Sequence, residues 1–169
     1  MTLLRKTMLY LGVLILTASL TNTSETYVHA ATSTKTLSKS QTISLLKNGR
    51  KAMDNVFEKS YTTPLTQKQI YDIMQPYFTP KYIENFIKCD LEPVGDKWKS
   101  TRGGAVYVYA FYYNSNFKVT YSKDKSKSYV SEKNYEEGEG GYVTQKLILI
   151  KTKAGWRIDQ YDDDARYFM

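Results

Sequence analysis

The first regular pattern of apolar residues lies between Gln41 and Lys59. These residues recur at helical spacing, so they lie on one face of a helix. They are Ile43, Leu46, Met53, Val56 and Phe57. Gly49 interrupts the stretch, and a glycine in a helix interior costs about 1 kcal/mol relative to alanine. The pattern predicts a helix over residues 41–59 with Gly49 as its weak position.

Two shorter helices are predicted from their start signals. Thr66 and Gln69 have the spacing of a capping box, and Pro76 ends the helix that follows. Thr79 and Pro80 give a second start signal, with threonine as the cap and proline at the first helical position. The predicted inner faces of the two helices are Ile70, Ile73 and Met74, and then Tyr82, Ile83, Phe86 and Ile87.

After Asp90 the pattern changes to the alternation of β-strands. Residues 105–113 alternate between two sides that are both apolar or aromatic, which is typical of a central strand. One side carries Val106, Val108, Ala110 and Tyr112, and the other carries Tyr107, Tyr109, Phe111 and Tyr113. Further strands are predicted over residues 117–122, 129–133, 142–151 and 156–161, with residues 123–128 as a polar loop. In the last strand, Trp156 and Ile158 should point into the core and Arg157 away from it.

Helices followed by an antiparallel meander predict one α+β domain over residues 41–169. Its N-terminal helices should pack on one face of an antiparallel sheet of four or five strands. A concave cone of the nuclear-transport-factor-2 or cystatin-like type would leave a pocket at its open end. A flatter two-layer sandwich without a pocket is the alternative.

The first thirty residues have the features of a signal peptide. Arg5 and Lys6 precede an apolar stretch over residues 8–20, which is shorter than the roughly 20 residues needed to span a bilayer. Val28-His29-Ala30 has the small residues of a cleavage site. We therefore expect secretion or cell-wall association, with an uncleaved N-terminal membrane anchor as the alternative. Residues 31–40, rich in Thr, Ser and Lys, are expected to form a flexible linker.

Cleavage after Ala30 changes which chemistries the chain can perform. The whole chain has 24 Lys and Arg against 17 Asp and Glu, and 22 against 16 remain, a net charge of +6. His29 is the one histidine, so the remaining chain excludes a Ser-His-Asp triad and a His-ligated zinc site. Cys89 has no second cysteine to pair with. We expect it to be a small buried residue near a helix end, and a reactive thiol is the alternative.

Several segments resemble a known family. They are Pro64-Leu65-Thr66 to Ile73, Gln75-Pro76-Tyr77-Phe78-Thr79, Tyr82-Ile83-x-x-Phe86, and Gly155-Trp156-Arg157-Ile158-Asp159-Gln160-Tyr161. In these the chain is similar to the small exported proteins of spore-forming Gram-positive bacteria grouped as domain of unknown function 3993. The resemblance extends from about Leu45 to Tyr161, and it departs from the family's composition at residues 103–107. It implies export, but no activity.

The aromatic side of residues 105–113 is the most unusual feature of the chain. Tyr107, Tyr109, Phe111 and Tyr113 could line a ligand pocket or form a platform on which flat ligands stack. Ordinary packing beneath the helices is the alternative. The 16 tyrosines against 6 phenylalanines place several hydroxyl groups near water, which agrees with a pocket rim.

Two groups of basic residues are candidates for binding polyanions. Lys47, Arg50 and Lys51 fall within one turn of the first predicted helix, and Lys123, Lys125 and Lys127 lie in one loop. An exported basic protein meets anionic cell-wall polymers and membrane surfaces. Simple solvation of these side chains is the alternative. Because no RNA-binding signature is present, a nucleic-acid partner is not expected.

The acidic residues form two clusters, Glu132, Glu136, Glu137 and Glu139 in a glycine-rich loop and Asp162, Asp163 and Asp164 after the last strand. Carboxylates bind calcium, but neither cluster has EF-hand spacing. We therefore expect no metal site, no cofactor and no catalytic residue. The leading hypothesis is an exported, envelope-associated binding or accessory protein without catalytic activity. The alternative is a pocketed domain that binds or transforms a small ligand with tyrosines and carboxylates such as Asp159.

Overall fold

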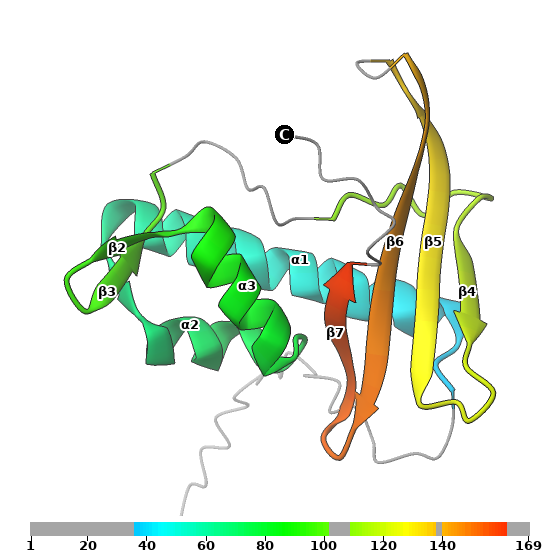
Figure 1. The fold of residues 1–169 in the computed structure, drawn as a ribbon, viewed down its shortest axis with the longest axis horizontal. Coiled ribbons are helices and arrows are strands. Elements are labelled where there is room, and N and C mark those ends of the chain that lie inside the picture. Colours follow the sequence, from blue (N-terminus) through cyan, green and yellow to red (C-terminus); the bar gives the residue numbers. More distant parts are fainter. Residues whose placement is uncertain (1–35, 102–108, 138–139, 162–169) are drawn as a thin grey trace, which may run out of the picture.

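The computed structural model describes residues 36–101, 109–137 and 140–161 (Figure 1). Its helices come first along the chain: α1 (Lys39–Thr62), α2 (Gln67–Met74) and α3 (Pro80–Asp90). Two antiparallel sheets accompany them, so the prediction of an α+β fold is confirmed. The cone-like comparison stays a prediction. No helix within the described ranges is long and apolar enough to span a membrane.

The two shorter helices begin at the residues that their sequence signals predicted. Thr66 and Gln69 form the capping box of α2, and Thr79 caps α3 with Pro80 in its first turn. A second capping box, formed by Ser38 and Gln41, starts α1. This helix therefore extends beyond the predicted range of residues 41–59 at both ends.

The larger sheet has the strand order β4-β5-β6-β7. Its strands are β4 (Lys118–Tyr121), β5 (Lys127–Glu136), β6 (Gly141–Thr152) and β7 (Gly155–Tyr161). The predicted strand over residues 129–133 is thus ten residues long, because β5 forms a continuous ladder with β6 from Lys127 to Glu136. Glu132 and Glu136 consequently lie in this strand, and their predicted placement in a loop is wrong.

A small three-stranded sheet was not predicted. It consists of β1 (Leu65–Thr66), β2 (Glu92–Val94) and β3 (Lys97–Lys99) in the order β1-β3-β2. Gly95 adopts a φ of 64° in the turn between β2 and β3, a conformation that glycine reaches without steric cost.

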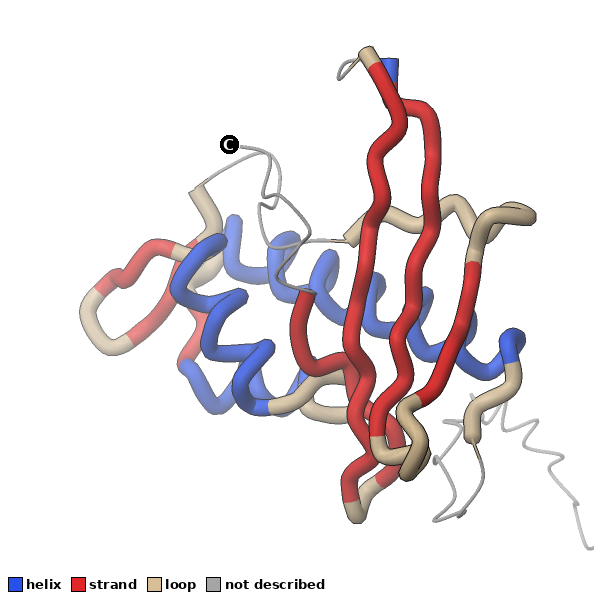
Figure 2. The backbone as a smooth tube through the Cα atoms, turned by 45° about the vertical axis from the view of Figure 1, so that its right-hand side comes forward, coloured by secondary structure: helices blue, strands red, loops and turns tan. Residues whose placement is uncertain are grey.

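The long helix crosses one face of the larger sheet. Figures 1 and 2 show α1 running behind strands β4–β7, with α2 and α3 beside β7. The loop between α2 and α3 bonds to the edge of β7, because Ile158 N–H donates to Tyr77 O over 2.8 Å and Thr79 N–H to Ile158 O over 2.9 Å. We call the face toward α1 the inner face of the sheet.

The core lies between α1 and this inner face. Buried side chains from α1 meet those of Val130, Leu147 and Leu149 on the strands. In β7, Trp156 is 5% exposed and Ile158 is fully buried, as predicted for the closing strand. Arg157 points to the other side, where its guanidinium donates to Gln75 O over 3.0 Å.

Gly49 is buried where α1 packs against Ile158 of β7. A Cβ at this position would lie 2.8 Å from Ile158 Cδ1, 2.8 Å from the Tyr109 hydroxyl and 3.0 Å from the Phe78 ring. The two distances of 2.8 Å are shorter than real Cβ contacts, and the distance of 3.0 Å is tighter than most of them. The residue that weakens the helical pattern is therefore the one that lets α1 approach the sheet.

Candidate functional site

One open cleft brings together the cationic and the aromatic candidate residues. It has a volume of about 310 Å³ and lies between α1 and residues 109–116, which we call the 109–116 segment. Its lining consists of Lys47, Arg50, Lys51, Tyr109, Ala110, Phe111 and Tyr113. We call it the α1 cleft. Six of these seven residues were predicted as binding residues in two separate groups, and Ala110 was not.

The 109–116 segment is attached to the sheet by side chains. The Glu132 carboxylate is fully buried and accepts hydrogen bonds from Tyr112 N–H at 2.6 Å and Asn114 N–H at 2.8 Å. The side chain of Gln145, which pairs with Glu132 across β5 and β6, accepts from Ala110 N–H at 2.8 Å. The described part of the predicted strand over residues 105–113 is therefore no strand, because its amides bond to side chains instead of a neighbouring strand.

The side chains of residues 109–113 alternate between a buried and an exposed side, as predicted from the sequence. Tyr109 and Phe111 are 1% and 9% exposed and face α1, whereas Tyr112 on the other side is 63% exposed. Adjacent rings on the buried side are in contact, with centroids 5.8 Å apart for Tyr109 and Phe111 and 6.2 Å for Phe111 and Tyr113. Tyr113 ends the alternation with a left-handed φ of 60°. Tyr107 lies outside the described residues.

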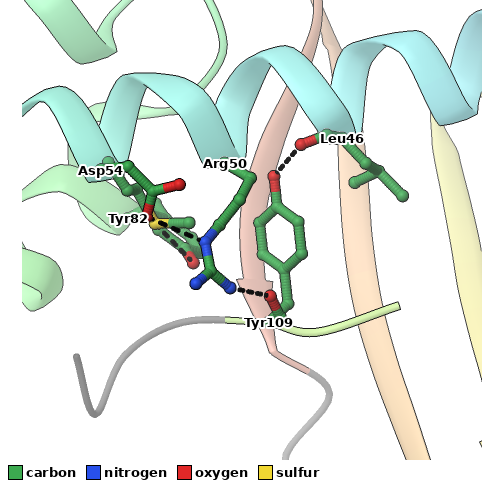
Figure 3. Close-up of polar contacts among 6 residues, drawn as sticks. Leu46, Arg50, Asp54, Tyr82 and Tyr109 are labelled. Carbon is green, nitrogen blue, oxygen red and sulfur yellow. Dashed lines mark hydrogen bonds and ion pairs between the residues drawn. The ribbon is translucent and has the colours of Figure 1, made fainter. Parts of the chain in front are cut away.

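Arg50 connects α1 to the segment (Figure 3). Its Nε donates to Asp54 Oδ1 at 3.0 Å, and its Nη1 donates to the Tyr109 carbonyl at 3.0 Å. The Tyr109 hydroxyl donates in turn to the carbonyl of Leu46, one turn earlier in α1. Both ends of Tyr109 are thus bonded to the helix, which fixes this wall of the cleft.

Lys47 and Tyr113 form the outer part of the cleft. Lys47 Nζ lies 5.2 Å from the centroid of the Tyr113 ring, within the range of a cation–π contact. Burial raises the pKa of Tyr113 to about 12, nearby Glu132 acts in the same direction, and Arg50 opposes them. The phenol is therefore neutral at physiological pH and can donate a hydrogen bond. Lys51 is exposed beside them.

This lining suits the binding of anions. Two ammonium groups and a guanidinium supply positive charge, and the rings supply an apolar wall. The described lining includes no carboxylate, cysteine or histidine. Asp159 lies elsewhere, at the edge of β7, where its carboxylate accepts from the Thr79 hydroxyl at 2.8 Å. Within the described ranges, no three Asp, Glu, His or Cys side chains are grouped as metal ligands.

The second basic group is not part of this cleft. Lys123, Lys125 and Lys127 are exposed in and after the turn between β4 and β5. Hydroxyl groups of Ser122 and Ser126 donate to the Asp124 carboxylate there and lower its pKa to about 2. Lys127 precedes Glu132 by five residues on β5, which corresponds to roughly 16 Å along a strand. The structure therefore separates the two basic groups.

The sequence profile of a family described as "Protein of unknown function (DUF3993)" matches residues 38–134, more than half of the chain. The chain belongs to this family. The match confirms the resemblance, although the closing strand at residues 155–161 lies outside the matched range. No curated protein matches the chain.

The DUF3993 match includes every residue that lines the α1 cleft. It begins at Ser38, the cap of α1, and ends within β5 after Glu132. Gln145, which holds Ala110, lies beyond it on β6. The lining of the cleft therefore lies within the region that the family shares.

Sequence patterns could have indicated Glu132 but not its role. Ser128, Val130 and Glu132 alternate along β5 and all face inward, so a charged residue on this side needs a buried partner. Those partners are backbone amides of the 109–116 segment, and no side-chain pattern encodes amides.

Cys89 differs from its predicted placement in this DUF3993 chain. It lies at the end of α3, as expected, but its side chain is exposed. The helix turns Phe86 and Ile87 toward the core, which leaves position 89 on the solvent side. Partial burial and the neighbouring Asp90 raise the pKa of the thiol, so little thiolate is present at neutral pH.

Proposed function

We propose that this protein is a non-catalytic binding protein of the bacterial envelope, which holds an anionic group of its ligand in the α1 cleft. One observation carries the proposal: Lys47, Arg50 and Lys51 share a cleft of about 310 Å³ with three aromatic side chains. A cleft of this volume admits a single charged group with an attached ring or short chain.

The cations in the cleft have different tasks. Arg50 is bonded to Asp54 and to the backbone of Tyr109, so its guanidinium is held in place by two of its five N–H donors. Lys47 and Lys51 are exposed, and each can turn its ammonium group toward an anion. The neutral Tyr113 hydroxyl adds a donor beside them. We assign the direct contact with the anion to the two lysines and Tyr113.

The envelope as the place of action rests on the sequence. Residues 1–30 have the features of a signal peptide, and the rest of the chain has a net charge of +6. An anionic cell-wall polymer or a membrane surface is the partner that such a protein meets. Secretion with wall association is our proposal for its localisation, and an N-terminal anchor is the alternative.

The alternative function, transformation of a ligand, requires a carboxylate next to the tyrosines. Glu132 lies behind the 109–116 segment with its oxygens bonded to two amides, and Asp159 is bonded to Thr79. Both carboxylates are occupied by contacts within the fold. These contacts support binding without catalysis.

Binding to isolated Gram-positive cell walls tests the proposal. The full chain and the variant Lys47→Glu/Lys51→Glu are sedimented with walls at low and high salt. We expect the variant to bind at least about tenfold more weakly at low salt, because two positive charges in the cleft become negative. A tenfold loss of affinity corresponds to about 1.4 kcal/mol. Lys97→Glu/Lys153→Glu is the matched control, because both lysines are exposed and lie outside the cleft lining. Equal retention of the two variants would contradict the assignment of the cleft.

A further inference from the structure

The outer face of the larger sheet, turned away from α1, is a second surface with distinctive chemistry. Side chains alternate along β5, so Val130 and Glu132 are buried on the inner face while Tyr129 and Tyr135 are 40% and 58% exposed on the outer face. In Figure 1 the strands stand in front of α1, and the described helices lie behind or beside β4, β5 and β6. The described elements therefore leave this face open.

The charged residues on the outer face of β4, β5 and β6 are all lysines. Lys118 on β4 and Lys146 on β6 lie in one row across the sheet, because both pair with Ser131 of β5. Lys127 and Lys133 lie on β5 before and after that row. Among the described outward positions of these three strands there is no Asp or Glu. The outer face of these strands is therefore positively charged, which favours binding of an anionic partner.

Three tyrosines are interleaved with these lysines. Tyr129 lies between Lys127 and the row of Lys118 and Lys146. Tyr135 and Tyr142 pair directly across β5 and β6, with their ring centroids 5.5 Å apart. Lys133 Nζ lies 4.9 Å from the centroid of the Tyr142 ring. The outward residues of β5 from Lys127 to Tyr135 are Lys, Tyr, Ser, Lys and Tyr, so charges and rings are interspersed over a length of roughly 26 Å.

We propose that this lysine–tyrosine face binds an acidic polysaccharide that runs along β5 and β6. A chain of sugar rings with acidic substituents presents anions and rings along its length, and the lysines and tyrosines interspersed along β5 and β6 can contact both. Tyrosine offers a flat apolar face together with a hydroxyl, and a sugar ring offers C–H groups on its face and hydroxyls on its edge.

The type of cation also favours a polysaccharide over a nucleic acid. Arginine is the residue that recognises phosphate with paired hydrogen bonds, whereas lysine acts as a single point charge. Arg157, at the β7 side of this face, donates to two backbone carbonyls at 2.9 and 3.0 Å. The remaining cations are lysines, which suit separated single charges along a glycan.

This inference does not depend on the α1 cleft. The cleft lies between α1 and the 109–116 segment on the inner side, and none of its lining residues belongs to the four strands. The two proposals can therefore fail independently of each other.

Binding of the full-length chain, expressed with its own N-terminus, to polygalacturonate tests the proposal. The probe is a linear glycan with a carboxylate on each ring, and a neutral glucan is the comparison. We expect Lys118→Glu/Lys133→Glu to bind polygalacturonate about tenfold more weakly at low salt, with most of the difference lost at high salt. Tyr142→Ala, which removes a side chain that is 68% exposed, should weaken binding about three- to tenfold at all salt concentrations. Lys97→Glu/Lys153→Glu, which makes the same change of charge at exposed positions outside both sites, should bind like the unmodified chain.

Two further probes separate the alternatives. Inorganic polyphosphate carries charge without rings, and a single-stranded DNA oligonucleotide carries both. We expect both to bind more weakly than polygalacturonate. Tighter binding of the oligonucleotide would overturn the polysaccharide as partner. If Lys97→Glu/Lys153→Glu loses as much polygalacturonate binding as Lys118→Glu/Lys133→Glu, the assignment of this face is overturned. Binding would then depend on net charge alone.

Discussion

Arg50 and Tyr109 are joined by a 3.0 Å hydrogen bond from the guanidinium to the backbone carbonyl, across 59 positions of sequence. The same guanidinium donates to Asp54 at 3.0 Å, so its planar shape serves two acceptors at once. Arg50 is therefore a positioning residue for the aromatic wall as well as a charge in the cleft.

Replacement of Arg50 by lysine should separate these two roles. Arg50→Lys keeps the positive charge but offers one nitrogen in place of the separate Nε and Nη1 that serve the two acceptors, so we expect the free energy of unfolding to fall by about 1 kcal/mol. Lys51→Arg is the matched exchange at the neighbouring exposed position and should change stability by less than about 0.5 kcal/mol. Urea denaturation of both variants provides the measurement. If Arg50→Lys is as stable as Lys51→Arg, the bond from Arg50 to Tyr109 does not contribute to the free energy of unfolding.

Gly49→Ala should destabilise the protein even though alanine is the better helix former. The gain in helix propensity is about 1 kcal/mol, whereas overpacking of a core costs typically about 1–3 kcal/mol. The new methyl group would meet Ile158 Cδ1 and the Tyr109 hydroxyl, each at 2.8 Å. The cost of crowding should exceed the gain in helix propensity, so the free energy of unfolding should fall.

A double mutant tests the cause of that loss. Ile158→Val removes the Cδ1 atom that the new methyl group would meet. The cost of Gly49→Ala, measured by thermal or urea denaturation, should therefore be smaller in the Ile158→Val background. Strict additivity of the two substitutions would show that crowding against Ile158 is not the reason.

Local signals allowed the helices to be predicted. The caps at Thr66 and Thr79 act through neighbouring backbone amides, so the sequence contains the whole interaction. The small sheet was missed for the opposite reason. Its strands have two or three residues, and those of β2 are all exposed, so no alternation distinguishes them from loops.

The site was predictable only in parts. The alternation of Tyr109, Phe111 and Tyr113 shows which side they face, but the hydrogen-bond partners of a segment are not encoded in its own side chains. Likewise the charge of Lys47 and Arg50 is visible in the sequence, whereas their meeting with Tyr109 depends on how α1 crosses the sheet. Lys123, Lys125 and Lys127 look equivalent in sequence and lie elsewhere in the fold.

Ser128→Ala should leave stability unchanged or raise it. The Ser128 hydroxyl is fully buried and has no hydrogen-bond partner within the described part of the chain. Removing a buried polar group that makes no hydrogen bond removes a desolvation cost. Ser60→Ala is the matched control, because Ser60 is also fully buried but its hydroxyl donates to Phe57 O at 3.3 Å. We expect this control to lose about 0.5–1.5 kcal/mol in denaturation experiments. A larger loss in Ser128→Ala than in Ser60→Ala would contradict the assignment of an unpartnered hydroxyl.

The buried position of Tyr113 should make stability fall at high pH. Burial raises the pKa of its phenol to about 12 in the folded protein, from 10.0 for an ordinary tyrosine. Between these values the unfolded chain has released the proton and the folded chain has kept it, so the free energy of unfolding decreases as pH rises. Below about pH 10 both states are protonated and the contribution is fully present.

Comparison with Tyr113→Phe isolates this effect, because phenylalanine keeps the ring and lacks the titrating group. The unfolding free energies of the two proteins are measured by urea denaturation at about pH 9 and about pH 11, on either side of the ordinary tyrosine pKa. We expect the unmodified protein to lose more stability than Tyr113→Phe over this interval. Phenolate absorbance should report the same event, with one tyrosine fewer ionising at the high end of the titration in the variant. Parallel loss of stability in both proteins would show that Tyr113 titrates like an exposed tyrosine and that its hydroxyl is not held within the wall of the cleft.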